Sequence, residues 1–141
     1  NLFQEGINEF IHYMDDPRIV ILTQGIDDPN YNEHAFLSTY FGYTLVQSAD
    51  LTVRNGEVCL KSLQGLGKIN VILRWIPDQS IDSLEQTQYS LHGIPGLLQA
   101  VREGSVKVLN PFGSGVLSSP AIQCNLAQLS EQLLQQLLFS R

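Results

Sequence analysis

The sequence predicts an α/β fold in which a mainly parallel β-sheet carries an inserted β-hairpin and flanking helices. Two short apolar runs rich in β-branched residues, at 18–25 and 68–75, are typical of strands buried on both faces of a parallel sheet. Segments with helical spacing of apolar residues alternate with these strands, and that alternation favours a parallel sheet. With 141 residues, 43% of them hydrophobic, the chain is expected to form one domain over residues 1–141.

The first third of the chain predicts a helix, a strand, a second helix and a second strand. An apolar stripe at helical spacing defines the first helix: Leu2, Phe3, Ile7, Phe10, Ile11 and Met14. The strand at 18–25 follows. Asn30, with Glu33 three residues later, then suits the capped start of a helix that Gly42 ends. The expected packing face of that helix consists of Ala35, Phe36, Leu37, Tyr40 and Phe41. Residues 43–47 form the second strand.

The middle of the chain predicts a hairpin and then a third parallel strand. The residues on either side of Asn55-Gly56 alternate in polarity, and this pair favours a two-residue hairpin turn. Residues 68–75 are the next buried strand. A short helix is expected to begin at Asp82 or Ser83 and to extend toward residue 91.

The last third of the chain predicts helix, strand and helix. Pro95 and Gly104 bound a helix within residues 93–104. Residues 105–110 return as a strand. From Ser119 onward, leucines at helical spacing predict one long amphipathic helix: Leu126, Leu129, Leu133, Leu134, Leu137 and Leu138.

Ligands of open parallel sheets bind outside the carboxyl ends of the strands. The loops expected to matter are therefore 24–32, 74–82 and 110–118. Arg74 ends a buried strand, and its permanent charge requires a partner, either a structural carboxylate or an anionic ligand. In the first loop, Glu33 is expected to act as a capping and dipole partner. His34 is expected to be a polar residue at the surface or in a cleft, and contact with a ligand is the alternative.

The third loop, NPFGSGVLSSPA at 110–121, combines glycines with a helix start. Ser119 suits the N-cap and Pro120 the first helical position. Gly113 and Gly115 permit a backbone that turns several N–H groups inward, beside about half a positive charge from the helix dipole. The loop is therefore either a site for a carboxylate or phosphate, or only a sharp turn. As a binding site, its amides at 113–115 would converge with the Arg74 guanidinium on one electropositive hollow.

Composition argues against several classes of function. Fourteen acidic and eight basic residues give a net charge of −6 without a Lys/Arg cluster, which disfavours nucleic acids and anionic membranes. The apolar runs fall short of the roughly 20 residues that span a bilayer. Cys59 and Cys124 are expected to be buried thiols in a reducing cytoplasm. The three histidines are too scattered to suggest zinc, and no Ser-His-Asp or Cys-His set is recognisable.

Five motifs occur in order over about residues 17–125: YNEH, DLTVRNG, LR, GIPGLL and NPFGSGVLSSP. This succession resembles the circularly permuted ATP-grasp proteins, which are related in fold to glutathionylspermidine synthetases. The resemblance implies a Rossmann-like pre-ATP-grasp domain, excised from a longer protein, on the acceptor-substrate side of a cytoplasmic ATP-dependent carboxylate–amine ligase. In such a ligase, ATP phosphorylates a carboxylate, and an amine then displaces phosphate from the acyl phosphate.

The same resemblance implies which residues and partners belong to this part of the ligase. The substrate-binding positions would be Tyr31, Glu33, His34, Arg74, Asn110, Gly113, Ser114 and Gly115. The fragment alone is expected to be inactive, with no catalytic residue, metal or cofactor of its own, while ATP and Mg²⁺ bind the parent protein. Its partners would be the remaining ATP-grasp lobes and a small amine or carboxylate, with neither nucleic acid nor membrane.

Two departures from the family pattern bear on the substrate contacts. Relatives often carry an acidic residue at the position of Ser118 and a more charged stretch at 75–78, so this member has either altered its substrate contacts or lost activity. The predicted final helix carries only Glu131 as a charge between residues 123 and 140, which suits docking to a neighbouring domain or to a second copy in a homodimer. The competing hypothesis is a noncatalytic interaction domain on the same scaffold.

Overall fold

The computed structural model describes residues 2–85 and 93–134. The chain forms two compact units, residues 1–111 and 112–141, and each is described by itself. The expectation of one domain over the whole chain stays a prediction. The helix expected from Asp82 or Ser83 lies largely outside the described residues, and the part that is described, 83–85, is a turn.

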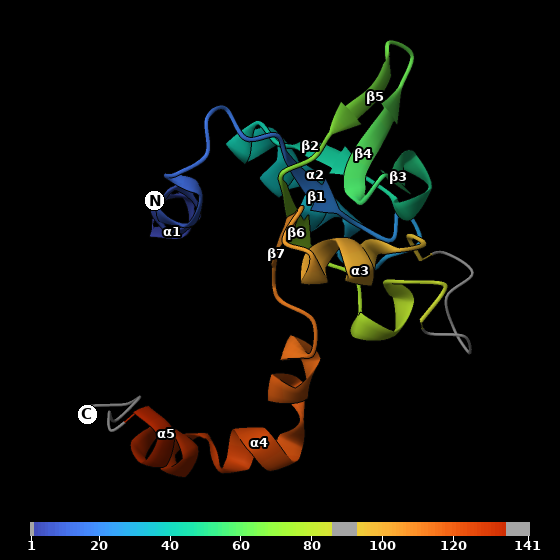
Figure 1. The fold of residues 1–141 in the computed structure, drawn as a ribbon. Coiled ribbons are helices and arrows are strands. Elements are labelled where there is room, and N and C mark those ends of the chain that lie inside the picture. The colour runs from blue at the N-terminus through green and yellow to red at the C-terminus, as the bar shows by residue number, and fades with distance from the viewer. Residues whose placement is uncertain (1, 86–92, 135–141) are drawn as a thin grey trace. The chain divides into compact units, whose positions relative to one another are not determined.

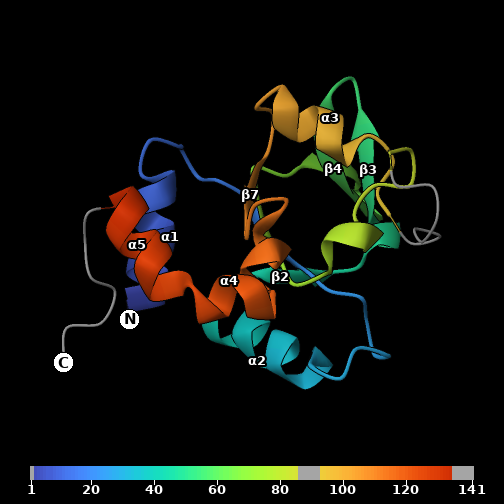
Figure 2. The ribbon, with the colours of Figure 1, turned by 90° about the horizontal axis from the view of Figure 1, so that it is seen from below.

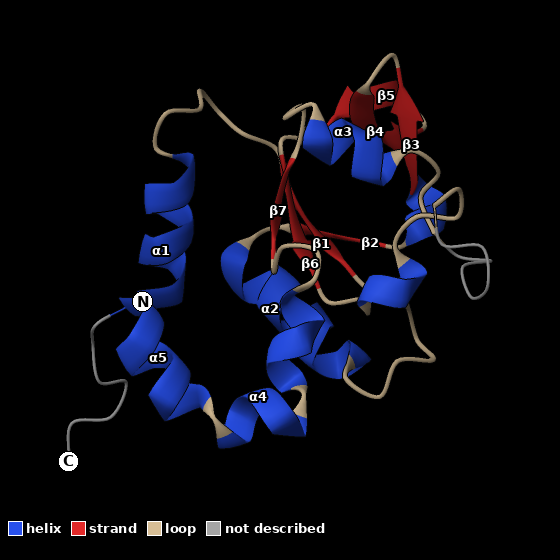
Figure 3. Ribbon diagram, turned by 60° about the horizontal axis from the view of Figure 1, so that its bottom comes forward, coloured by secondary structure: helices blue, strands red, loops and turns tan. Residues whose placement is uncertain are grey.

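A four-stranded, entirely parallel sheet forms the centre of the first unit, in the order β2-β1-β6-β7 (Figure 3). Its strands are β1 (Ile19–Leu22), β2 (Thr44–Val46), β6 (Val71–Arg74) and β7 (Lys107–Leu109). Ile21 pairs with Leu45 on one side and with Leu73 on the other. Every residue of β1 and β6 is buried, as their continuous apolar composition predicts. The parallel α/β fold is thus confirmed.

A second, antiparallel sheet stands beside the first (Figure 1). It contains β3 (Leu51–Arg54), β4 (Glu57–Ser62) and β5 (Gly65–Lys68). The predicted hairpin turn at Asn55-Gly56 is confirmed, with φ of 53° and 77°. The third strand was not predicted, because its two glycines lower the β-propensity of the segment. The strand expected at 68–75 is correspondingly shorter, and only 71–74 belong to the parallel sheet.

Helices α1 (Leu2–Ile11) and α2 (Tyr31–Phe41) contribute to one apolar core against the parallel sheet. The buried members of that core are Ile7, Ile11, Ile19, Ile21, Val71 and Leu73, with Leu37 of α2 packed against them. Helix α3 (Leu97–Arg102) lies beside the antiparallel sheet (Figure 2). Short 3₁₀ turns η1 (Ser48–Asp50) and η2 (Asp78–Ser80) follow β2 and β6.

The buried face of α2 differs from the predicted one. Phe36 and Tyr40 are 64% and 58% exposed and stack on each other, whereas His34 is 1% exposed. The placement of His34 at the surface is therefore wrong. The capping box is also wrong, because Asn30 occupies the N-cap position without a side-chain cap bond, although Gly42 ends the helix in the left-handed conformation as expected.

The second unit contains two described helices, so the prediction of one continuous helix is wrong there. A 3₁₀ turn η3 (Ser114–Ser118) precedes α4 (Pro120–Cys124), and α5 (Leu126–Leu134) follows. Asn125 separates them, with its side-chain Nδ2 donating to the Ala121 carbonyl, a local bond of the kind that competes with helical geometry. The leucines at 137 and 138 lie outside the described residues.

Two further expectations concern single residues of this region. Ser119 and Pro120 take the N-cap and first helical positions as predicted, although the serine hydroxyl makes no cap bond. Of the two thiols, Cys59 is buried but Cys124 is exposed, so the expectation of a buried Cys124 is wrong. Over the residues described, none of the helices is long and apolar enough to cross a bilayer.

Candidate functional site

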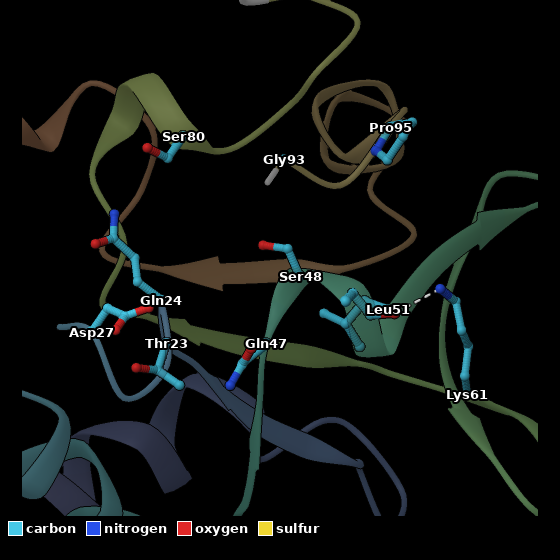
Figure 4. A pocket seen from close by; sticks show the side chains of 11 residues that line it. Thr23, Gln24, Asp27, Gln47, Ser48, Leu51, Lys61, Ser80, Gly93 and Pro95 are labelled. Atoms are coloured by element: carbon cyan, nitrogen blue, oxygen red, sulfur yellow. Dashed lines mark hydrogen bonds between the residues drawn. The ribbon is translucent and has the colours of Figure 1, made fainter. Parts of the chain in front are cut away.

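An open cavity of about 550 Å³ lies where the parallel strands end (Figure 4). This volume is within the range of small-molecule sites. The lining residues come from the segments after β1, β2 and β6, from β3 and β4, and from the approach to α3: Thr23, Gln24, Asp27, Gln47, Ser48, Ala49, Leu51, Lys61, Ser80, Gly93 and Pro95. The cavity thus occupies the edge of the sheet at which ligands of open parallel sheets bind.

The floor of the cavity is buried and its rim is exposed. Thr23 and Leu51 are 1% and 2% exposed, whereas Asp27 and Lys61 are exposed at the rim. The turn after β1 requires glycine, because Gly25 has φ of 103° and a Cβ there would lie 2.7 Å from Nε2 of Gln47. Because the rim is exposed, a molecule bound on this floor would remain accessible to a second reactant.

Thr23 connects the cavity to the buried His34 of α2. The threonine Oγ1 accepts a hydrogen bond from the Gly25 N–H at 3.3 Å and lies 2.9 Å from Nδ1 of His34. If Nδ1 carries the imidazole proton, Thr23 accepts twice and its own hydroxyl proton is available to the cavity. The buried Nε2 of His34 finds no hydrogen-bond partner in the described part of the chain. The ring centroid of His34 lies 5.8 Å from that of Trp75.

Arg74 and Asn110 hold the ends of β6 and β7 together. The guanidinium donates from Nε to the Asn110 carbonyl at 2.8 Å, from Nη1 to the Ile76 carbonyl at 2.6 Å and from Nη2 to the Pro111 carbonyl at 3.1 Å. In return, Nδ2 of Asn110 donates to the Arg74 carbonyl at 3.1 Å.

A carboxylate completes this arrangement around the arginine. Oδ1 of Asp78 lies 2.9 Å from Nη2 of Arg74, whose side chain is 5% exposed. Arg74 therefore has the structural carboxylate that was one of its two predicted partners. Asn110 has φ of 60°, a conformation that asparagine tolerates better than most residues and that directs its carbonyl to the guanidinium.

The predicted site residues fall into four places. Arg74 and Asn110 contact each other. His34 does not line the cavity, but its ring is within hydrogen-bond distance of Thr23, which does. At the start of α2, Tyr31 is half-buried and Glu33 is exposed, and neither belongs to the cavity lining.

The glycine segment belongs to the second unit. Gly113 has φ of 84° and precedes η3, which contains Ser114 and Gly115. The positive φ expected at Gly113 is therefore confirmed, whereas the positive φ expected at Gly115 is wrong, because Gly115 lies inside the 3₁₀ turn η3. The convergence of its amides with Arg74 stays a prediction.

Several cavity residues were not singled out from the sequence. Asp27 follows β1 in the loop 24–32, which was selected as a whole. Gln47 and Ser48 follow β2, and applying the strand-end rule to the second strand would have found them. Lys61 comes from the antiparallel sheet, and no local pattern indicates that β4 lies beside the ends of parallel strands.

The described residues do not offer a metal centre. Within 2–85 and 93–134, no group of three or more His, Cys, Asp or Glu side chains gathers where a metal ion could be held.

Comparison with known proteins places the chain among longer relatives. Residues 2–139 match the family described as circularly permuted ATP-grasp type 2. An uncharacterized protein of Mycobacterium tuberculosis strain H37Rv is 40% identical over 121 residues, which cover 86% of this chain and 14% of that protein. An uncharacterized protein of Synechocystis sp. strain PCC 6803 is 33% identical over 120 residues, covering 85% of this chain and 25% of the relative. The chain thus spans a quarter or less of these two relatives.

Proposed function

This chain belongs to the circularly permuted ATP-grasp family, and on that premise we propose that it forms the acceptor-substrate side of an ATP-dependent carboxylate–amine ligase. The family match over residues 2–139 is the observation that carries the proposal. The position of the cavity supports it, because an open cavity at the strand ends suits a substrate whose reactive end must meet a group held elsewhere.

The proposed reaction has two steps. A substrate carboxylate oxygen attacks the γ-phosphorus of ATP, and ADP leaves. The amine nitrogen of the acceptor then attacks the acyl carbon, phosphate leaves with the acyl oxygen, and the nitrogen loses a proton as the amide forms. In this proposal the chain binds and orients the acceptor, while ATP and Mg²⁺ bind in other parts of a longer protein.

Arg74 would act as a positioning residue in this scheme. Its guanidinium holds the Asn110 and Pro111 carbonyls, and the glycine segment follows directly in the chain. We assign to the amides of Gly113, Ser114 and Gly115 an anionic part of the acceptor or the acyl phosphate, because N–H groups near a glycine with positive φ can form an anion-binding concavity.

The test uses the complete product of the gene that encodes this chain. Phosphate release from ATP is measured with panels of amines and carboxylic acids, each alone and in pairs. A ligase releases phosphate at a substantial rate only when both substrates are present, and an amide product accumulates in equal amount. Release that does not depend on the amine and the acid contradicts the proposal. Absence of release with every pair favours the noncatalytic interaction domain.

A paired set of variants tests the assigned roles. The double variant Arg74→Ala, Gly113→Val is expected to lose phosphate release, whereas Arg102→Ala, which removes an exposed arginine outside the cavity, retains it. Release by the double variant at the wild-type rate would remove Arg74 and the glycine segment from the mechanism while leaving the ligase activity itself intact.

A further inference from the structure

The cavity has an acidic side and a basic side. Asp27 lies at one side with Gln24 and Ser80, and Lys61 lies at the opposite side near Leu51 (Figure 4). We propose that this cavity binds a small zwitterion of the amino-acid and short-peptide class, with its protonated amine toward Asp27 and its carboxylate toward Lys61. The inference rests on the proposed function, since it names the chemical class of the acceptor.

The acidic side is available to a ligand because the side chain of Asp27 is not bonded to any of the described residues. Two neighbouring carboxylates do have such bonds: Asp28 accepts from the Asn30 N–H at 2.8 Å, and Asp50 accepts from the Gln47 N–H at 2.8 Å. Within the described residues, Asp27 makes neither a hydrogen bond nor an ion pair, although it lines the cavity. A ligand amine placed there would therefore compete with no protein donor.

The basic side is held in place without being neutralised. Nζ of Lys61 donates one hydrogen bond to the Ala49 carbonyl at 2.7 Å. An ammonium has three donors, so two remain for a carboxylate. Among the described residues, Lys61 has no carboxylate partner, whereas Lys68 on the neighbouring strand is paired with Glu57. In a chain of net charge −6, an unneutralised ammonium at a cavity wall favours an anionic group there.

The wall between the two charges is neutral, and it combines polar groups with the apolar side chains of Leu51 and Pro95. It contains the Thr23 hydroxyl, the side chains of Gln47 and Ser48, and the hydroxyl of Ser80 on the other side. The volume of about 550 Å³ equals that of roughly 18 water molecules in the liquid. This is enough for an amino acid or a short peptide whose hydroxyl and amide groups hydrogen-bond to the wall.

The two charges also discriminate against other ligands. A polyphosphate would meet Asp27 at one side, and a polyamine would meet Lys61 at the other, and each like-charge approach weakens binding. A zwitterion matches both sides. Because both charged residues stand at the exposed rim, the ligand amine stays accessible to a reactant bound elsewhere.

Binding to the 141-residue chain is measured by NMR titration with four probes: glycylglycine, γ-aminobutyrate, spermidine and succinate. The zwitterions are expected to bind more tightly than the cation or the dianion, with shifts at the cavity residues. Asp27→Asn and Lys61→Met should each weaken zwitterion binding about tenfold, the loss of one hydrogen bond to a charged group. The controls Asp15→Asn and Lys107→Met, which remove charges outside the cavity lining, should leave binding unchanged.

A third variant covers the case in which a charge variant fails to fold. Ser80→Phe fills the cavity from its wall and is expected to abolish the shifts of the other cavity residues. Three results would overturn the assignment: binding of spermidine or succinate as tight as that of glycylglycine, zwitterion binding that survives in Asp27→Asn and Lys61→Met, or no binding of either zwitterion.

The two proposals fail in different ways. If the complete gene product forms amides from ATP at the same rate with and without Asp27→Asn, the ligase stands and this cavity is not its acceptor site. If the zwitterions bind the cavity but ATP is never consumed with any acid, the binding site stands and the ligase does not.

Discussion

Arg74 gives the sharpest test of how the strand ends are held together. Its guanidinium is almost completely buried and is bonded to three backbone carbonyls and the Asp78 carboxylate. The variant Arg74→Ala removes all of these donors and leaves the oxygens without their partner. The ends of β6 and β7 then keep their backbone pairing but lose the bonds that the Arg74 side chain adds.

The size of the loss follows from the number and type of the bonds. A hydrogen bond to a charged group contributes about 1.5–3 kcal/mol, and removal of one partner of a buried ion pair costs about 3–5 kcal/mol. These terms overlap, because Asp78 is 27% exposed and regains some water. We therefore expect Arg74→Ala to lower the free energy of unfolding by about 4 kcal/mol.

Urea unfolding followed by tryptophan fluorescence measures this loss. Trp75 is the one tryptophan of the sequence and is adjacent to Arg74. With a slope of about 2 kcal/mol per M, the midpoint should fall by roughly 2 M urea. Arg74→Lys keeps the charge but cannot reproduce the planar fork, so it should recover only part of the loss. Asp78→Asn keeps the arginine bonds to the carbonyls and should be milder.

The matched control is Arg102→Ala. Arg102 also forms a two-contact pair, with Glu85, but its side chain is 59% exposed. Solvent screening should make this pair nearly dispensable. If Arg74→Ala and Arg102→Ala shift the urea midpoint equally, burial of the Arg74 bonds does not increase their contribution to the free energy of unfolding.

Further predictions concern single residues of the first unit. Asp82→Asn should lower the unfolding free energy by about 2 kcal/mol in urea titrations, because the fully buried carboxylate accepts at least three backbone N–H bonds and an amide can accept on one side only. A stability equal to wild type would contradict this. Gly93→Ala should lower the melting temperature clearly, since a Cβ there would lie 2.6 Å from a backbone nitrogen, whereas Gly67→Ala meets only the flexible end of Arg18 and should melt near the wild type. The opposite order would refute the steric argument. Burial raises the pKa of Tyr43 above the ordinary 10.0, so the unfolded chain loses this proton first and stability should fall as the pH rises through 10. Tyr43→Phe should show a smaller fall when urea midpoints are compared below and above that pH.

Local sequence patterns predicted most of the secondary structure. The strands at β1 and β6 are short, continuous and β-branched, and few other structures suit such runs. The turn at Asn55-Gly56 follows from residues that tolerate positive φ. The helix ending at Gly42 and the helix beginning at Pro120 depend likewise on one or two neighbouring residues.

The candidate site was predictable only in part. The strand-end rule selected the loop that contains Asp27 and the loop that contains Ser80, and both line the cavity. It could not select Lys61, because the position of the antiparallel sheet relative to the parallel one is set by contacts between distant segments. The chemistry of a cavity with charges on opposite sides exists only once those segments meet.

The sequence by itself determined the order of the elements, the parallel sheet of the first unit and the family, because these depend on residue types and on spacing along the chain. Only the tertiary structure decided that His34 is buried while Phe36 and Tyr40 face solvent. Apolar residues occur around much of α2, so their periodicity does not select one face, and burial is settled by whichever face the sheet covers. Arg74 shows the same division: its charge alone predicts that it needs a partner. Which oxygens meet that need depends on where β7 ends.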